Sequence, residues 1–321
     1  MKKIIAFLFV AYIAINAGNL CAQTLQEAAD AYNKALELKN TDLPGSITSL
    51  VNVVGMCEKI GAEADDLKKM ASGVIPDLQY SLANNMLKEK KYDEAIAAFE
   101  KTTEYANTYN DADKISKVQA QLPRIYYAKS LDQYKAEDLD GALASLDKAT
   151  TLDPEYTKAF YTKGIIYKKK DDAANMQTAF DKTIELAAKD GDSVTGNKAK
   201  ESMASSLLIS ANKALSAKKY ADAIKFANSS LAYSTVRSNT YLILTLSYNS
   251  TSKFDLAIEA ANKGLELEAK PEKKVDFYFQ LGKAYEGKND NANACANFRK
   301  VNVGPNKAAA DYEIKTVLKC K

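Results

Sequence analysis

The side chains that proteins use most for acid–base catalysis and metal binding are scarce in this chain. It contains no histidine, the commonest general base and the commonest metal ligand. Without histidine, neither a Ser-His-Asp nor a Cys-His arrangement can form. The acid pairs Asp65-Asp66 and Asp171-Asp172 could transfer protons in principle. However, they lie at predicted helix starts, where a carboxylate stabilises the helix by interacting with its dipole. We therefore predict no catalytic, cofactor-binding or metal-binding residues.

Three cysteines, Cys57, Cys295 and Cys320, follow residue 22. They are too scattered for a zinc site. Cys295 and Cys320 lie nine and sixteen residues from a predicted turn near Gly304, which implies a stagger of about 10 Å along antiparallel helices. A disulfide needs Cα atoms within about 7 Å, so this pair can form only if the chain folds back. The alternative is that all three are small buried apolar residues.

The start of the sequence has the pattern of a secretory signal peptide. Met1-Lys2-Lys3 precedes an apolar run from Ile4 to Ile15, which is shorter than the roughly 20 residues that span a bilayer. We predict cleavage after Ala22. Leu20, where a lipobox has a small residue, disfavours lipidation of Cys21. No second apolar run follows, so we expect an exported, periplasmic protein without an integral membrane segment.

The overall charge gives no sign of a nucleic-acid partner. Without residues 1–22, which hold Lys2 and Lys3 and no acid, the chain has 42 basic and 41 acidic residues, a net charge of +1. Nucleic-acid-binding domains carry a basic excess that this chain lacks. Its 46% hydrophobic residues are typical of a folded protein.

Apolar residues at helical spacing predict pairs of helices through most of the chain. In residues 140–167, one apolar stripe ends at Leu152, and Asp153 and Pro154 are predicted to be the N-cap and first residue of the next helix. Phe160, Gly164 and Tyr167 then follow on one face. Similar pairs recur at about 76–102, 126–149, 160–184, 207–226, 241–258 and 278–298.

The N-terminal part is less regular. Helices are expected at 24–40 and 47–60, followed by a shorter helix that ends at Gly73. Because an interior proline costs about 3 kcal/mol, each proline is assigned to a helix boundary. The six are Pro44, Pro76, Pro123, Pro154, Pro271 and Pro305.

The spacing of equivalent residues indicates a repeat. Successive steps are 47, 34, 47, 34 and 37 residues along Ala95, Ala142, Met176, Ala223, Ala257 and Ala294. A step near 34 residues is typical of stacked helical hairpins. The two longer steps add 13 residues at about 105–117 and 188–200, as either longer helices or loops. We divide the chain into a signal peptide (1–22), divergent N-terminal helices (23–75), an array of about six repeats (76–302) and a capping helix (303–321).

The residues of the last pair resemble the tetratricopeptide repeat family. Tyr278, Leu281, Gly282, Tyr285, Ala294 and Phe298 follow its pattern, and Phe160, Gly164, Tyr167 and Phe180 follow it in an earlier pair. The resemblance implies an all-α superhelical solenoid of antiparallel helix pairs, completed here by the capping helix. It also implies a concave groove lined by the first helix of each pair. The family's groove positions correspond to Tyr80, Asn84, Tyr127, Tyr161, Lys168, Asn212, Asn249 and Phe279, whose alternative role is to fill the core between repeats.

We interpret the chain as a non-catalytic scaffold that binds a protein or peptide partner in the bacterial periplasm or cell envelope. One alternative is a structural subunit that assembles an envelope complex by self-association. Another is an enzyme with two convergent carboxylates in a deep pocket. Separately, Asp192-Ser193-Val194 resembles a short bacterial O-glycosylation acceptor, which makes Ser193 a candidate modification site.

Overall fold

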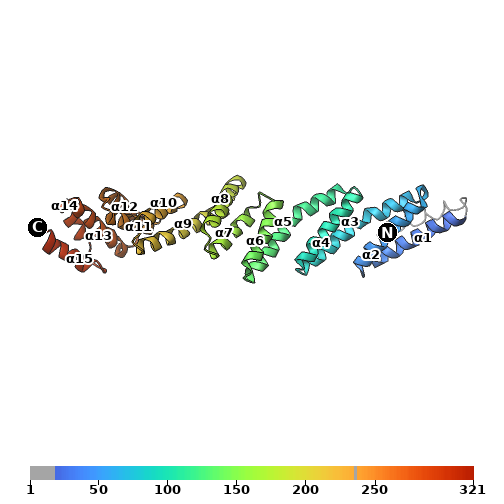
Figure 1. Cartoon of the computed structure of the whole chain (residues 1–321), viewed down its shortest axis with the longest axis horizontal. Helices are drawn as coiled ribbons and strands as arrows, with labels where there is room; N and C mark the ends of the chain where they lie inside the picture. The colour runs from blue at the N-terminus through green and yellow to red at the C-terminus, as the bar shows by residue number, and fades with distance from the viewer. Residues whose placement is uncertain (1–18, 235–236) are drawn as a thin grey trace. The chain divides into compact units, whose positions relative to one another are not determined.

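The computed structural model describes residues 19–234 and 237–321, and these residues form α-helices joined by short turns. Figure 1 shows the helices in chain order. Their bounds are α1 Asn19–Leu38, α2 Leu43–Ile60, α3 Asp65–Lys88, α4 Tyr92–Thr108, α5 Ala112–Lys135, α6 Leu139–Leu152, α7 Thr157–Lys169, α8 Ala173–Asp190, α9 Ser193–Ser216, α10 Tyr220–Tyr233, α11 Ser238–Ser250, α12 Phe254–Leu267, α13 Pro271–Gly287, α14 Asn291–Phe298 and α15 Lys307–Tyr312. A 3₁₀ turn (Ala62–Ala64) precedes α3, and a π-helical turn (Glu313–Val317) follows α15.

The predicted all-α solenoid of helix pairs is confirmed. The chain forms two compact units, residues 1–159 and 160–321. In the first, each helix from α1 to α6 packs against the next, and in the second the same holds from α8 to α14. Within each unit every hairpin therefore buries its apolar face against its neighbours, as a repeat array requires. No helix within the described ranges is long and apolar enough to cross a membrane. The predicted signal peptide, apart from residues 19–22, lies outside these ranges and stays a prediction.

The periodic residues lie where the sequence predicts. The small residue of each second helix is buried, with at most 6% of its surface exposed: Ala95, Ala142, Met176, Ala223, Ala257 and Ala294. Phe99, Leu146, Phe180 and Phe298, each four residues further on, are fully buried. Leu146 thus fills, without an aromatic ring, a position at which the other three place phenylalanine.

Two prolines are not at helix boundaries, and this prediction was wrong. Pro76 lies inside α3 and Pro123 inside α5, each 24 residues long. Gly73, predicted to end a helix, is also inside α3. Each proline removes one backbone hydrogen bond. Buried residues on both sides of Pro76, such as Ile75 and Leu78, hold the helix together across that loss.

The other prolines lie between helices or at their starts. Pro44 and Pro271 occupy the first turns of α2 and α13. Pro154 precedes α7 by three residues, so it is not the first residue of that helix. Asp153 is not its N-cap either, because its carboxylate accepts a hydrogen bond from the Glu155 N–H in a tight turn. This turn continues through Tyr156 before α7 begins.

The two 13-residue additions lengthen helices and do not form loops. The first extends α4 to Thr108 and begins α5 at Ala112, and the second does the same for α8 and α9. Asp111 and Asp192 cap the extended helices by accepting hydrogen bonds from the Lys114 and Thr195 N–H groups. Ser193, the candidate modification site, is exposed at the first position of α9.

Candidate functional site

The best-formed candidate site lies between the first helices of two consecutive pairs, α3 and α5. Tyr80 and Asn84 come from α3 and are both half-buried. Gln121 of α5, which the sequence pattern does not single out, joins them. The Tyr80 hydroxyl donates to Gln121 Oε1 (2.5 Å), and Gln121 Nε2 donates to Asn84 Oδ1 (3.1 Å). Asn84 Nδ2 donates to the Tyr80 carbonyl, so this polar cluster is internally satisfied.

The Tyr80 ring is fixed on two sides. It meets Phe99 edge-on, with centroids 5.4 Å apart. The Lys114 ammonium lies 5.1 Å from its centroid, within the range of a cation–π contact. Lys114 is only 7% exposed, and its ammonium also pairs with the Asp77 carboxylate. The Tyr80 ring therefore packs α3 against α4 and α5, and part of the side chain remains exposed at the surface.

Beside this cluster is an open hollow of about 360 Å³. Its lining surface is mainly apolar and includes the aliphatic side chains of Leu87, Ala120, Ile125 and Ala128, together with Lys117. Arg124 contributes an exposed guanidinium at the edge. Such a surface offers apolar area together with a cation that suits a carboxylate or a backbone carbonyl. The hollow is a shallow contact surface rather than an enclosed pocket with two convergent acids.

The aromatic candidates on other helices pack against neighbouring elements. Tyr127 contacts Tyr156, with ring centroids 5.2 Å apart, and burial raises the pKa of Tyr156. Tyr161 packs on Phe180 at 5.8 Å, and Phe279 packs on Phe298 at 5.7 Å. All three candidates are half-buried, so each ring contributes to the core and to the surface at once.

The remaining polar candidates have different surroundings. Asn249 is half-buried and donates from Nδ2 to the carbonyl and side-chain oxygens of Gln280, both at 3.0 Å. This links α11 to α13 within the second unit. Asn212 is exposed and donates to the Leu208 carbonyl in its own helix. Lys168 is exposed in the last turn of α7. The structure does not gather these residues into one site.

A charged cluster joins the α3–α4 turn to α5. The Asp132 carboxylate accepts hydrogen bonds from the Lys90 ammonium (2.9 Å) and the Tyr92 hydroxyl (3.0 Å). These bonds lower the pKa of Asp132 to about 2. Lys129 pairs with Asp93 alongside. The opposite charges largely neutralise each other, so the cluster ties consecutive pairs together and is not an anion site.

Comparison with known proteins identifies the repeat and offers distant structural matches. Residues 275–302, which cover most of α13 and α14, match the tetratricopeptide repeat family profile. No curated protein matches the sequence. A crystal structure of MamA is 23% identical, covers 61% of this chain and 96% of its own, and has a TM-score of 0.36. A tetratricopeptide repeat protein from Parabacteroides merdae is 16% identical, covers 93% of this chain and 100% of its own, and has a TM-score of 0.30.

The matched segment is one member of the series of helical pairs described above. It contains the contact between Gly282 and Phe298, in which a Cβ added to the glycine would lie 2.5 Å from the ring. Gly164 and Phe180 make the same contact at the corresponding position of an earlier pair. Residues 275–302 therefore match a tetratricopeptide repeat, and the other hairpins of the described residues are similar to this repeat in their pairing and packing.

Proposed function

We propose that this chain is a non-catalytic scaffold that binds a protein or peptide partner along the first helices of its pairs. The observation that carries the proposal is the hollow between α3 and α5. It presents apolar area from Leu87, Ala120 and Ala128 beside the exposed Arg124. Side chains of an extended or helical segment can bury themselves there, while Arg124 orients a carboxylate or carbonyl of the partner.

We further propose that the protein acts after export, in the periplasm or cell envelope. The signal-peptide pattern of residues 1–22 motivates this location. The Cys295–Cys320 disulfide supports it, because disulfides form and persist mainly in oxidising compartments. Expression in the native cell followed by fractionation tests the proposal. Recovery of the reduced, uncleaved chain from the cytosol would contradict it.

Site-specific photo-crosslinking in intact cells tests the binding surface. A photoreactive residue replaces Ala120, which lines the hollow, and in a matched control replaces Lys148, an exposed residue of the second helix α6. We expect reproducible adducts from position 120 but not from position 148. We also expect Arg124→Glu to remove them.

The alternative function, self-association into an envelope complex, predicts a different product. Adducts whose mass and peptides come from a second copy of this chain would favour that alternative. Equal adducts at both positions, or none at either, would refute binding at the hollow.

A further inference from the structure

Residues 305–321, which we call the cap, form a short segment against the last helical pair. The cap contains α15, six residues long, and the single π-helical turn Glu313–Val317. Helices shorter than about 12 residues are marginal in water without tertiary contacts. The conformation of the cap must therefore depend on what holds it against α13 and α14.

The noncovalent contacts of the cap are few. Ala310 is its fully buried apolar residue, and Ile314 and Leu318 are partly buried against the cluster of Val275, Ala294, Phe298 and Val301. By contrast, 58% of Tyr312 and 47% of Val317 are exposed. Two polar links add to this: the Lys283 ammonium lies 3.0 Å from Glu313, and Asn306 donates to Asp276 at 3.1 Å.

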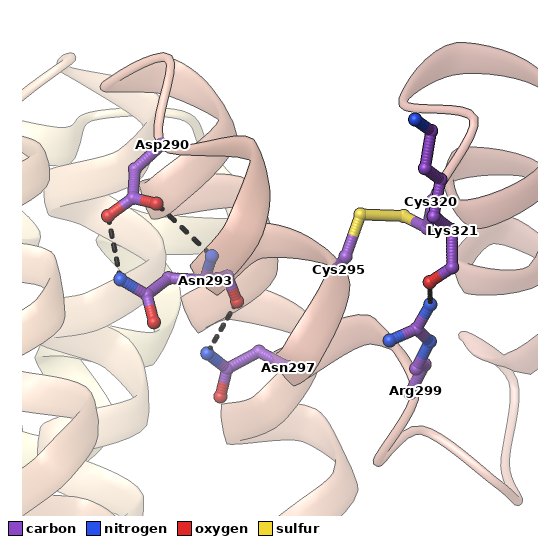
Figure 2. The surroundings of a disulfide bond; sticks show 7 residues. All are labelled: Asp290, Asn293, Cys295, Asn297, Arg299, Cys320 and Lys321. Carbon is purple, nitrogen blue, oxygen red and sulfur yellow. Dashed lines mark hydrogen bonds between the residues drawn. A yellow bond between two sulfur atoms is a disulfide. The ribbon is translucent and has the colours of Figure 1, made fainter.

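A disulfide supplies the remaining connection (Figure 2). Cys295 of α14 bonds to Cys320, with Cα atoms 5.8 Å apart. The chain folds back to reach it: Lys319 has a φ of +51°, and the Cys320 N–H donates to the Ile314 carbonyl. This reversal removes the stagger expected for two straight helices. Arg299 also donates to the Lys321 carbonyl beside the bond.

We propose that the Cys295–Cys320 disulfide is a redox-controlled lock on the cap. In the oxidised protein the bond holds the cap over the apolar end of α13 and α14. In the reduced protein the cap detaches while the helical pairs before it stay folded. Detachment uncovers Val275 and Phe298, which are 5% and 0% exposed when the cap is in place. The state of one bond thus determines whether this apolar surface is accessible.

The reaction is thiol–disulfide exchange with a dithiol reductant. A thiolate of the reductant attacks one sulfur, breaking the S–S bond and forming a mixed disulfide. The second thiol of the reductant then attacks that mixed disulfide. Cys295 and Cys320 leave as two thiols, having gained two electrons and two protons, and the reductant becomes a disulfide.

Cys57 provides an internal control. It is 2% exposed in α2, in the core cluster with Leu50 and Val53, and it is unpaired. Burial raises the pKa of its thiol, which disfavours the reactive thiolate. Because Cys57 has no disulfide for a reductant to break, an effect of reduction is expected to come from Cys295–Cys320.

Hydrogen exchange of the full chain, followed by mass spectrometry with and without a phosphine or dithiol reductant, tests the lock. We expect reduction to speed exchange in residues 305–317 by roughly 30-fold or more, the factor implied by a typical disulfide. Peptides from α9 to α12 should be unchanged. Cys320→Ala should exchange at the fast rate without reductant and respond no further to it, whereas Cys57→Ala should behave like the wild type.

Three results would overturn the proposal. The first is unchanged exchange in residues 305–317 on reduction, which would mean that noncovalent contacts suffice. The second is faster exchange throughout residues 160–321, which would mean that the bond supports the whole unit and not the cap. The third is alkylation of Cys295 and Cys320 in the air-oxidised protein without prior reduction, which would show that the bond does not form.

Discussion

At the scale of single residues, the packing of this repeat protein depends on glycines that admit phenylalanine rings. Phe180 is fully buried and its ring lies against Gly164, where an added Cβ would be 2.6 Å from Cε1. An added Cβ would therefore require the ring or the backbone of α7 to shift, which is costly in a close-packed core. The glycine is therefore a packing requirement, although glycine lowers helix propensity.

We predict that Gly164→Ala destabilises the protein by about 1–3 kcal/mol, the usual cost of overpacking a core. Gly73→Ala is the matched control. Gly73 also lies inside a helix but has nothing within 4 Å of an added Cβ, so alanine there should stabilise by about 0.5–1 kcal/mol. Urea unfolding of both variants measures the difference. Equal effects of the two substitutions would contradict the role given to Phe180.

The sequence predicts such apolar contacts but not the polar ones. Gly164 and Phe180 occupy regular positions in a repeating pattern, so their contact follows from periodicity. Gln121 has no periodic signature, and its partners Tyr80 and Asn84 are 41 and 37 residues away. Which long polar side chain reaches which partner depends on the register of two packed helices. That register is set by many apolar contacts together, so Gln121 could not be identified from the sequence.

The Asp132 cluster gives a prediction for pH. Because its folded pKa is about 2, below the ordinary carboxyl value of 3.8, Asp132 stabilises the fold above pH 4, and this stabilisation is lost as the pH falls from 4 to 2. We expect Asp132→Asn to lack this part of the acid dependence. We expect Lys90→Gln to raise the pKa of Asp132, because the hydrogen bond from Lys90 is the main cause of the shift. Carboxyl-carbon NMR titration measures the pKa, and an unshifted value in Lys90→Gln would refute this assignment.

At the scale of helices and turns, the same reversal recurs with different residues. In seven of these turns, the residue that reverses the chain has a positive φ, between 57° and 62°, although it is not a glycine. These residues are Lys90, Asn110, Glu137, Asp171, Lys218, Ser252 and Asn289. After each, the next N–H donates to a carbonyl five residues earlier, as Lys219 does to Ala214. This is a Schellman-type helix end, for which glycine is the usual residue. The left-handed conformation of a non-glycine residue costs conformational energy at each of these turns. It persists because the packing of the flanking helices fixes the turn.

We predict that Lys218→Gly stabilises the protein by about 0.5–1 kcal/mol, because glycine adopts the left-handed conformation without the steric cost of a Cβ. Lys218→Ala removes the same charged side chain but keeps the Cβ, so it should not stabilise. Chemical unfolding of the two variants separates conformation from charge. Stabilisation by alanine equal to that by glycine would show that the charge of Lys218 is responsible.

The sequence is sufficient to predict that the helices form, but not to predict where several of them begin and end. Periodic apolar residues predict nearly every pair, but Pro76 and Pro123, which are predicted to be helix boundaries, lie inside α3 and α5. A proline removes one hydrogen bond, and a 24-residue helix with buried residues on both sides retains enough contacts to continue. The prediction that Asp153 is an N-cap was wrong for a related reason. A carboxylate can cap a helix or close a tight turn, and the contacts of the neighbouring residues determine which of the two forms.

At the scale of the molecule, a repeat array needs protection at the end of its apolar core. Each helical pair gains stability from its neighbours, so the last pair has one apolar face without a following repeat. Here the cap covers that face, with Ala310 and Ile314 against Val275 and Phe298. The sequence predicts one capping helix over residues 303–321, whereas the structure forms the short α15 and a single π-helical turn there. The sequence leaves the disulfide undecided, because the reversal at Lys319 interrupts the helical geometry from which the stagger was calculated.

We predict that deletion of residues 303–321 lowers the melting temperature and promotes aggregation. The deletion removes the cap contacts together with the bond, whose loop of 25 residues corresponds to roughly 3.5 kcal/mol in the chain-entropy estimate. The double variant Cys295→Ala, Cys320→Ala removes only the bond and is the matched control. It should melt between the wild type and the truncated chain and aggregate less, since Ala310 and Ile314 can still cover the cluster part of the time.

The effect of the deletion should also be local. Stability in stacked repeats is close to a sum of nearest-neighbour terms, so loss of the cap should weaken α13 and α14 most and the earlier pairs of residues 160–321 progressively less. Hydrogen exchange in residues 24–159 should not change. Calorimetry, light scattering and peptide-resolved exchange on the three proteins test this order. If the truncated chain melts and scatters light like the wild type, the final segment does not act as a cap, because the apolar end of α14 would then need no cover.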